Sequence, residues 1–284
     1  MSNRVTEAEK IVSTQAPTGE RSEPDLLAVG PQGDGFWNQF LWLFLYAVAM
    51  AWVEAAVVLY LRTIVGQMDP YRPQPMPGPP ILEKAELIRE AATLVMLVSV
   101  GWLAGRSWRS RLACAVVAFG VWDIFYYVFL KVLTGWPNSC LDWDILFLLP
   151  LPWWGPVLAP VLIALLMIGG GMLVARFDSR LHPFWPSRRS LVLNLCGGLL
   201  ALYVFMTDAI HALGQGSQAL RNLLPVWFNW PLFLAALGLM ALPVLELAWR
   251  AWRQRALGGR GILGSESRCR RPITTTATTT KPSL

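Results

Sequence analysis

Charged residues are scarce in this chain of 284 residues, where Asp, Glu, Lys and Arg together make up only 15% of the sequence. A typical soluble domain contains about 25%, so neither a soluble globular enzyme nor a disordered scaffold fits this composition. The four cysteines form no Cys-x-x-Cys pair, which argues against a disulfide-stapled secreted domain. These shortages leave a polytopic membrane protein as the class that fits.

The sequence also lacks the motifs of several common cofactors. Of its two histidines only His211 falls in an apolar segment, whereas His182 lies in a loop, so a bis-histidine haem is not expected. There is no Walker motif and no Gly-x-Gly-x-x-Gly run, so no nucleotide is expected either. A divalent metal ion is the one cofactor class that the sequence leaves open.

Long apolar runs are abundant, with 55% hydrophobic residues and 15 tryptophans. Several segments each supply about 20 apolar residues, the length that a helix needs to cross a ~30 Å hydrocarbon layer. Helices are expected because a spanning segment must satisfy its own backbone hydrogen bonds. The sequence therefore predicts an all-α polytopic transmembrane helical bundle. Its six spans are expected at 36–65, 87–105, 112–133, 153–175, 191–213 and 226–249.

Basic residues indicate how this bundle is oriented. If the N-terminus is cytoplasmic, 18 of the 24 lysines and arginines fall in the two tails and the inner loops, as the positive-inside rule requires. This predicts a multi-pass protein of the bacterial plasma membrane with both termini in the cytoplasm. The expected domains are a flexible tail at 1–35, the transmembrane domain at 36–257 and a disordered tail at 258–284.

The net charge of +6 follows from this topology, so the chain is expected to partner with the lipid bilayer and with no nucleic acid. Self-association and membership of a larger membrane complex both stay open. One outer loop carries an apolar run at 141–149, with Asp142 and Asp144 near its start. Nine residues cannot span a bilayer, so the run predicts an interfacial or re-entrant helix. It would either cap an outer cavity or lie on the lipid surface.

Ionisable side chains inside the predicted spans carry the most information about function, because such groups are costly in a membrane and usually face the bundle interior. They are Glu54, Glu90, Asp123, Asp208 and His211. Their depths along the helices place them in the outer half of the bundle, where Asp208 and His211 share one helix face. Arg89 is the one fixed cation at comparable depth, although Arg62 and Lys131 could reach in from the outer rim.

An excess of buried acids can be neutralised in three ways, and each predicts a different function. A bound cation would suit a metal-dependent membrane enzyme acting on a lipid-borne or small extracytoplasmic substrate. Bound protons or cations in a relay would suit a proton- or cation-coupled carrier. Ion pairs with nearby basic residues would suit a non-catalytic membrane subunit, in which a structural polar network fixes the helix register.

The metal-dependent hypothesis assigns a role to each candidate residue. The metal ligands would be Glu54, Glu90, Asp123, Asp208 and His211, with one Asp-x-x-His pair among them. Catalytic groups would be drawn from Glu90, Asp123 and His211. Arg89, Tyr126 and Tyr127 would bind the substrate, because Tyr126 and Tyr127 place phenol groups beside Asp123.

Four stretches of the sequence resemble an uncharacterised group of bacterial six-span integral membrane proteins. These stretches are 53–60, 89–93, 122–127 and 152–156. The similarity covers the six-helix body and neither tail. It implies the six-span bundle, and it implies no activity, ligand or partner.

Overall fold

The computed structural model describes residues 33–66, 71, 80–178, 184–214 and 224–266, and it consists mainly of helices. Six helices in this described part are long and apolar enough to cross a membrane, which confirms the predicted six-span helical bundle. Their bounds are α1 Gly33–Val65, α2 Pro80–Ala104, α3 Trp108–Thr134, α4 Leu158–Phe177, α5 Arg188–Leu213 and α7 Trp230–Glu266. Two short strands, β1 Trp143–Phe147 and β2 Trp153–Pro156, complete the described structure.

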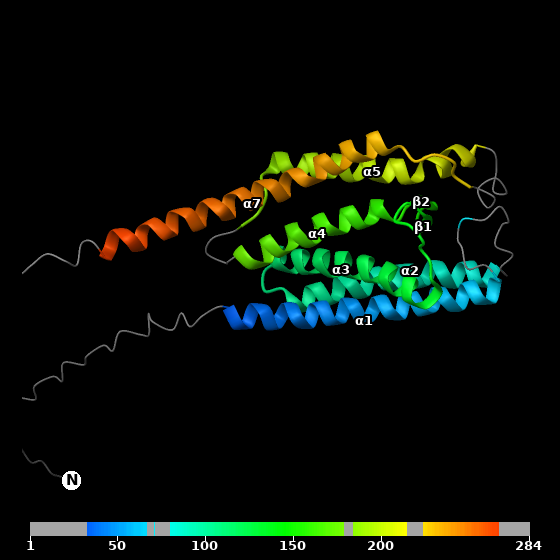
Figure 1. Cartoon of the computed structure of the whole chain (residues 1–284), viewed down its shortest axis with the longest axis horizontal. Coiled ribbons are helices and arrows are strands. Elements are labelled where there is room, and N and C mark those ends of the chain that lie inside the picture. The colour runs from blue at the N-terminus through cyan, green and yellow to red at the C-terminus, as the bar shows by residue number, and fades with distance from the viewer. Residues whose placement is uncertain (1–32, 67–70, 72–79, 179–183, 215–223, 267–284) are drawn as a thin grey trace, which may run out of the picture.

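Consecutive helices run in opposite directions, so α1 begins and α7 ends on the same side of the bundle (Figure 1). We call this side the terminal end, and the opposite side, toward which β1 and β2 lie, the hairpin end. Helix α3 is central, because it packs against α1, α2 and α4. In its most apolar window 56% of the residues are buried, against 22–39% for the other five helices. Helices α5 and α7 pair with each other, and α7 contacts the rest through α4.

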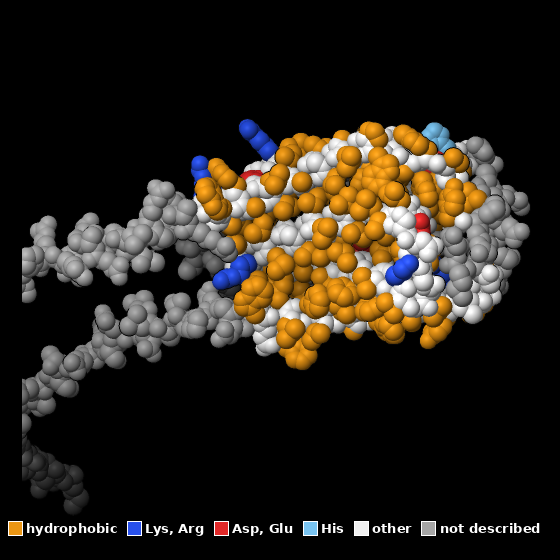
Figure 2. Space-filling model, viewed as in Figure 1, with side chains coloured by type: hydrophobic (Ala, Val, Ile, Leu, Met, Phe, Trp, Pro, Cys, Tyr) orange, Lys and Arg blue, Asp and Glu red, His pale blue; other side chains and the backbone are white. Residues whose placement is uncertain are grey.

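The flank of the bundle is apolar, as a lipid-facing surface must be. Large hydrophobic side chains such as Leu103, Ile64 and Leu195 are exposed along it. Figure 2 shows hydrophobic side chains across the face of the bundle, with few charged groups between them. Together with the length and hydropathy of the six helices, this surface makes the chain a multi-pass integral membrane protein.

Several helix boundaries differ from those expected. Helix α2 begins at Pro80 rather than at 87, because proline is favoured in the first turn of a helix. Helix α4 begins at Leu158 rather than at 153, since 153–156 forms a strand. Helix α7 continues to Glu266, so the expected disordered tail at 258–284 begins with helical residues. The rest of that tail, and 1–32 of the N-terminal tail, lie outside the described residues.

The prediction of a helix at 141–149 is wrong. Strand β1 pairs with β2 as an antiparallel hairpin, in which Asp144 lies opposite Gly155 and Ile145 opposite Trp154. Prolines at 150 and 152 stop a helix from continuing, and the Trp, Ile and Phe side chains of β1 favour a strand. The hairpin packs against α4 and α5 through β2. Backbone that is not helical is tolerated in a membrane protein when protein surrounds it in this way.

Glycines allow two helix pairs to approach closely. A Cβ atom on Gly171 of α4 would lie 2.8 Å from the carbonyl oxygen of Ala113 on α3. A Cβ atom on Gly197 of α5 would lie 2.7 Å from the carbonyl oxygen of Ala236 on α7. Small residues at such positions are how membrane helices gain contact area, because lipid provides little hydrophobic driving force between them.

Replacing Gly197 with alanine should therefore destabilise the fold by about 1–3 kcal/mol, since the new methyl group meets a backbone oxygen. Gly198 is the matched control, because nothing lies within 4 Å of its Cβ position. Alanine at Gly198 should stabilise the helix by up to about 1 kcal/mol. Thermal unfolding of both variants in detergent checks this, and equal melting temperatures would contradict the described packing of α5 on α7.

Candidate functional site

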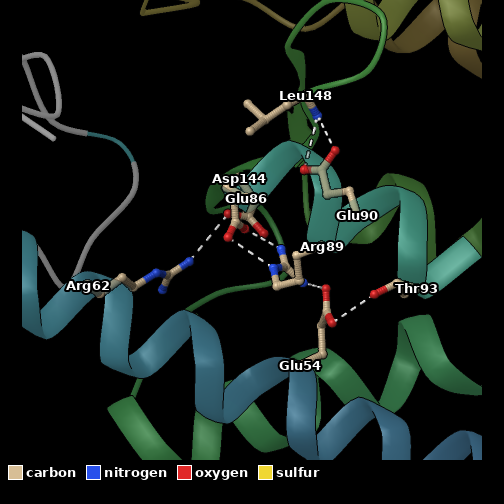
Figure 3. A network of polar contacts seen from close by, with 8 residues as sticks. All are labelled: Glu54, Arg62, Glu86, Arg89, Glu90, Thr93, Asp144 and Leu148. Carbon is tan, nitrogen blue, oxygen red and sulfur yellow. Dashed lines mark hydrogen bonds and ion pairs between the residues drawn. The ribbon is translucent and has the colours of Figure 1, made fainter. Parts of the chain in front are cut away.

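Buried polar side chains gather between α1, α2, α3 and the β-hairpin, and we call this group the acidic network. Helices α1 and α2 supply most of it, and β1 supplies one carboxylate (Figure 3). Helix α3 supplies one further carboxylate, Asp123. Its members are Glu54, Arg62, Glu86, Arg89, Glu90, Thr93, Asp123 and Asp144. Six of them are at most 8% exposed. The exceptions are Glu86 and Arg89, whose side chains are 19% and 20% exposed.

Arg89 lies at the centre of the α1–α2 part of the network. Its Nη1 atom forms an ion pair with Glu54 of α1, and its Nε atom donates a hydrogen bond of 3.0 Å to Glu86 Oε2. The second oxygen of Glu54 accepts a hydrogen bond of 3.1 Å from the Thr93 hydroxyl. Glu86, Arg89 and Thr93 recur at helical spacing, so one face of α2 presents all three. One guanidinium group thus holds two carboxylates from two helices.

Glu90 connects α2 to the hairpin. Both of its carboxylate oxygens accept the backbone N–H of Leu148, at 3.0 and 3.2 Å. Leu148 directly follows β1, so this contact satisfies a backbone donor where the strand pairing ends. An ionised carboxylate is a stronger acceptor than a protonated one, so the charge on Glu90 strengthens the attachment of the hairpin.

A second ion pair joins the hairpin to α1. Arg62 Nη2 lies 3.5 Å from Asp144 Oδ1, with side chains that are only 7% and 3% exposed. The Arg62 guanidinium also lies over the Trp136 ring, 4.5 Å from its centroid. Tyr127 of α3 lies within electrostatic range of Asp144. The buried carboxylate of β1 is thereby paired with α1 and lies beside α3.

Asp123 is the least satisfied acid in the network. It is 8% exposed, and its Oδ2 atom is fully buried without a hydrogen-bond partner among the described residues. Asp144 lies within electrostatic range of Asp123, so the two carboxylates repel each other when both are ionised. Tyr126, on the same helix, lies within electrostatic range of Asp144 and of both arginines.

Counting the charges shows an imbalance. The network contains five carboxylates and two guanidinium groups, so full ionisation would leave three negative charges. Uncompensated carboxylates are very costly in a buried environment, and they bind protons or a cation instead. The five acids are Glu54, Glu86, Glu90, Asp123 and Asp144. This surplus of acid is the chemical property that distinguishes the site.

The structure brings together part of the predicted cluster. Glu54, Glu90, Asp123 and Arg89 do converge, and Arg62 does reach in from the rim. Lys131 does not reach in, because it is exposed and its ammonium group donates to the carbonyl oxygen of Gly135. Tyr126 and Tyr127 border the site, as their spacing from Asp123 predicted.

Asp208 and His211 stand apart from the acidic network. Both lie on α5, which packs against α7 and β2, whereas the network lies between α1, α2, α3 and the hairpin. Asp208 is half-buried and His211 is exposed. Within the described ranges no group of three or more His, Cys, Asp or Glu residues is placed to hold a metal ion. The predicted five-residue metal set is therefore not assembled in this structure.

Sequence reasoning missed the roles of Asp144 and Thr93. The sequence predicted an interfacial or re-entrant helix around Asp144, although prolines after the run could have indicated a short strand instead. Thr93 follows Glu86 and Arg89 at helical spacing, but a hydroxyl group gives no signal of its own at the sequence level.

Comparison with known proteins adds no further assignment to these residues. No protein-family model, no curated protein and no solved structure matches the chain. A functional conclusion must therefore come from the geometry and the charges of the site.

Proposed function

We propose that the chain is a proton-coupled membrane carrier, and that the acidic network is its proton-binding site. The observation that carries this proposal is the buried surplus of five carboxylates over two guanidinium groups. Ionisable groups inside membrane proteins commonly mark ion paths and proton relays. Protons can neutralise the surplus carboxylates one at a time. A metal ion would instead require several ligands arranged around one point, and the described residues hold no such group.

Asp123 is the proton acceptor in this proposal. An ionised Asp123 would leave a buried oxygen unsatisfied and would repel Asp144. Protonation removes the charge, and a neutral carboxyl group costs less to bury than a carboxylate. Binding a proton at Asp123 therefore removes the repulsion from Asp144 and lowers the cost of the unsatisfied oxygen.

Proton binding would be coupled to movement through the hairpin. Two of the contacts between the hairpin and helices α1 and α2 use carboxylates: Glu90 with the Leu148 N–H, and Asp144 with Arg62. Protonating either carboxylate weakens its contact, because hydrogen bonds to ionised groups are roughly twice as strong as those between neutral groups. Proton uptake at Glu90 or Asp144, in addition to the proton on Asp123, would loosen the hairpin, and proton release from these two carboxylates would hold it in place.

Charge displacement after a pH jump tests the proposal without knowledge of the transported solute. Proteoliposomes adsorbed on a solid-supported membrane should give a transient current when the pH falls to neutrality from an alkaline value at which Asp123 is ionised. The variant Asp123→Asn should reduce this current several-fold, because it removes the proton acceptor. Asp208→Asn is the matched control, since Asp208 lies outside the network, and it should leave the current unchanged. A wild type that gives no current, or an Asp123→Asn variant that matches it, would favour a purely structural network.

The orientation of the bundle is part of this proposal, with the hairpin end facing outward and both termini in the cytoplasm. The distribution of basic residues supports it. Cys140 is exposed beside the hairpin, so a membrane-impermeant maleimide should label it in intact bacterial cells that produce the protein. Cys140→Ser provides the background. If Cys140 were labelled only in permeabilised cells, the hairpin end would face the cytoplasm and the proposed orientation would be wrong.

A further inference from the structure

A separate apolar groove runs along the flank of the bundle, between α1 and α4 and over α3. Its volume is about 570 Å³. Every side chain that lines it is aliphatic or aromatic, including Phe40 and Phe44 from α1, Val121 and Phe125 from α3, and Ile168 and Met172 from α4. The groove contains no member of the acidic network, so it requires a separate explanation.

A cation lies at the terminal end of this groove. Ile168, Met172 and Arg176 follow one another at intervals of four residues, so one stripe of α4 lines the groove and then ends in a positive charge. The Arg176 guanidinium lies 5.3 Å from the centre of the Phe36 ring. Phe36 in turn contacts Phe40, with ring centres 4.5 Å apart. An exposed arginine therefore adjoins the apolar groove.

Neighbouring arginines are engaged in other contacts. Arg109 lies 3.6 Å from Asp178, and Arg111 donates to the carbonyl oxygen of Gly105 while it lies over the Trp102 ring. Within the part of the chain that the structure describes, Arg176 forms no ion pair with a carboxylate. Its charge is available to a ligand at the membrane surface.

We propose that this groove binds one acyl chain of an anionic phospholipid from the leaflet at the terminal end, with the headgroup phosphate on Arg176. The stripe from Ile168 to Arg176 rises by about 12 Å along the helix, which matches most of a leaflet's hydrocarbon depth of about 15 Å. Trp37 also lines the groove and is 60% exposed at its terminal end, where amphipathic aromatic rings suit the membrane interface. A negatively charged phosphate complements the guanidinium group.

A second copy of the chain suits the groove less well. It would have to cover Arg176 as well as the apolar lining, and it would need an acid at that position to avoid burying an unpaired charge. Lipid chains surround the spanning helices on every side and need no such partner. The apolar groove and the arginine at its end match the acyl chain and the phosphate of a phospholipid.

Lipid binding to the full chain in detergent tests the proposal, with native mass spectrometry as the readout. Phosphatidylglycerol should bind more tightly than phosphatidylcholine with the same acyl chains. Arg176→Gln should weaken phosphatidylglycerol binding roughly fivefold. It should weaken phosphatidylcholine binding less, because the choline ammonium offsets the charge of that phosphate. Met172→Trp should weaken both, because it fills the groove. Arg253→Gln is the matched control, since Arg253 also lies over an aromatic ring, that of Trp249 on α7. This control should bind both lipids as the wild type does.

Four results would overturn the proposal. The first is equal binding of the two lipids to the wild type, a comparison that does not depend on any variant folding. The second is an Arg176→Gln variant that binds phosphatidylglycerol as the wild type does. The third is competition by inorganic phosphate alone, which would indicate an anion site without a role for the acyl chain. The fourth is a dimer of the wild type that Met172→Trp dissociates, which would make a second copy the occupant.

Discussion

Replacing Arg89 with methionine should destabilise the protein by about 3–5 kcal/mol, the usual cost of removing one partner from a buried ion pair. Arg89 contacts Glu54 and Glu86, and its side chain is 20% exposed. Methionine fills a similar volume without charge, so both carboxylates would lose their cation inside the bundle. Unfolding in mixed micelles, followed by the change in helicity, measures the effect.

Two further variants separate the charge effect from loss of packing. Arg250→Met is the control, because Arg250 pairs with Glu246 but is 41% exposed, and exposed pairs contribute only about 0–1 kcal/mol. Adding Glu54→Gln to Arg89→Met should recover part of the lost stability, since it removes one of the two carboxylates that have lost their cation. An Arg89→Met variant as stable as Arg250→Met would mean that Arg89 does not hold the network together.

The second large effect should follow from Arg62→Met, and it should depend on pH. Arg62→Met removes the guanidinium group that pairs with Asp144, while Asp144 still lies within electrostatic range of Asp123. Asp144 must then bind a proton to stay buried, whereas in the unfolded chain its pKa returns to about 3.9. Each pH unit above about 4 should therefore cost the variant up to about 1.4 kcal/mol relative to the wild type.

Thermal unfolding of wild type and Arg62→Met at several pH values checks the sign of this effect. The difference in stability should be smallest below about pH 4, where the carboxylate of the variant is protonated in both the folded and the unfolded state. It should widen as the pH rises toward neutrality. A difference that stays constant with pH would show that Arg62 acts only through its packing on Trp136, and that the Asp144 carboxylate needs no compensation.

The spans could be predicted from sequence because bilayer thickness and backbone hydrogen bonding constrain them so strongly. The convergence of Glu54 with Arg89 was also predictable, since both lie at similar depth on adjacent helices. Depth alone did not place Asp208 and His211, because it fixes neither which helices are neighbours nor how each is rotated. Helix α5 packs against α7 and β2 instead of facing the network.

The hairpin shows a different limit of sequence reasoning. The apolar run before Pro150 and Pro152 fits a short buried strand and a short helix almost equally well. An interfacial or re-entrant helix gave Asp144 no predicted partner, whereas the strand buries it to 2% exposure beside Arg62. This one choice of secondary structure decided whether the second ion pair of the site could be anticipated.

The most direct test of the proton-binding site asks whether a buried carboxyl group is protonated at neutral pH. Infrared spectra of the full chain in lipid, compared between wild type and Asp123→Asn, isolate the signal of the Asp123 side chain. We expect the wild type to show the carbonyl band of a protonated carboxylic acid, which Asp123→Asn loses and Asp208→Asn retains. A difference spectrum that contains only carboxylate bands would mean that Asp123 is ionised, and it would contradict the proposed site.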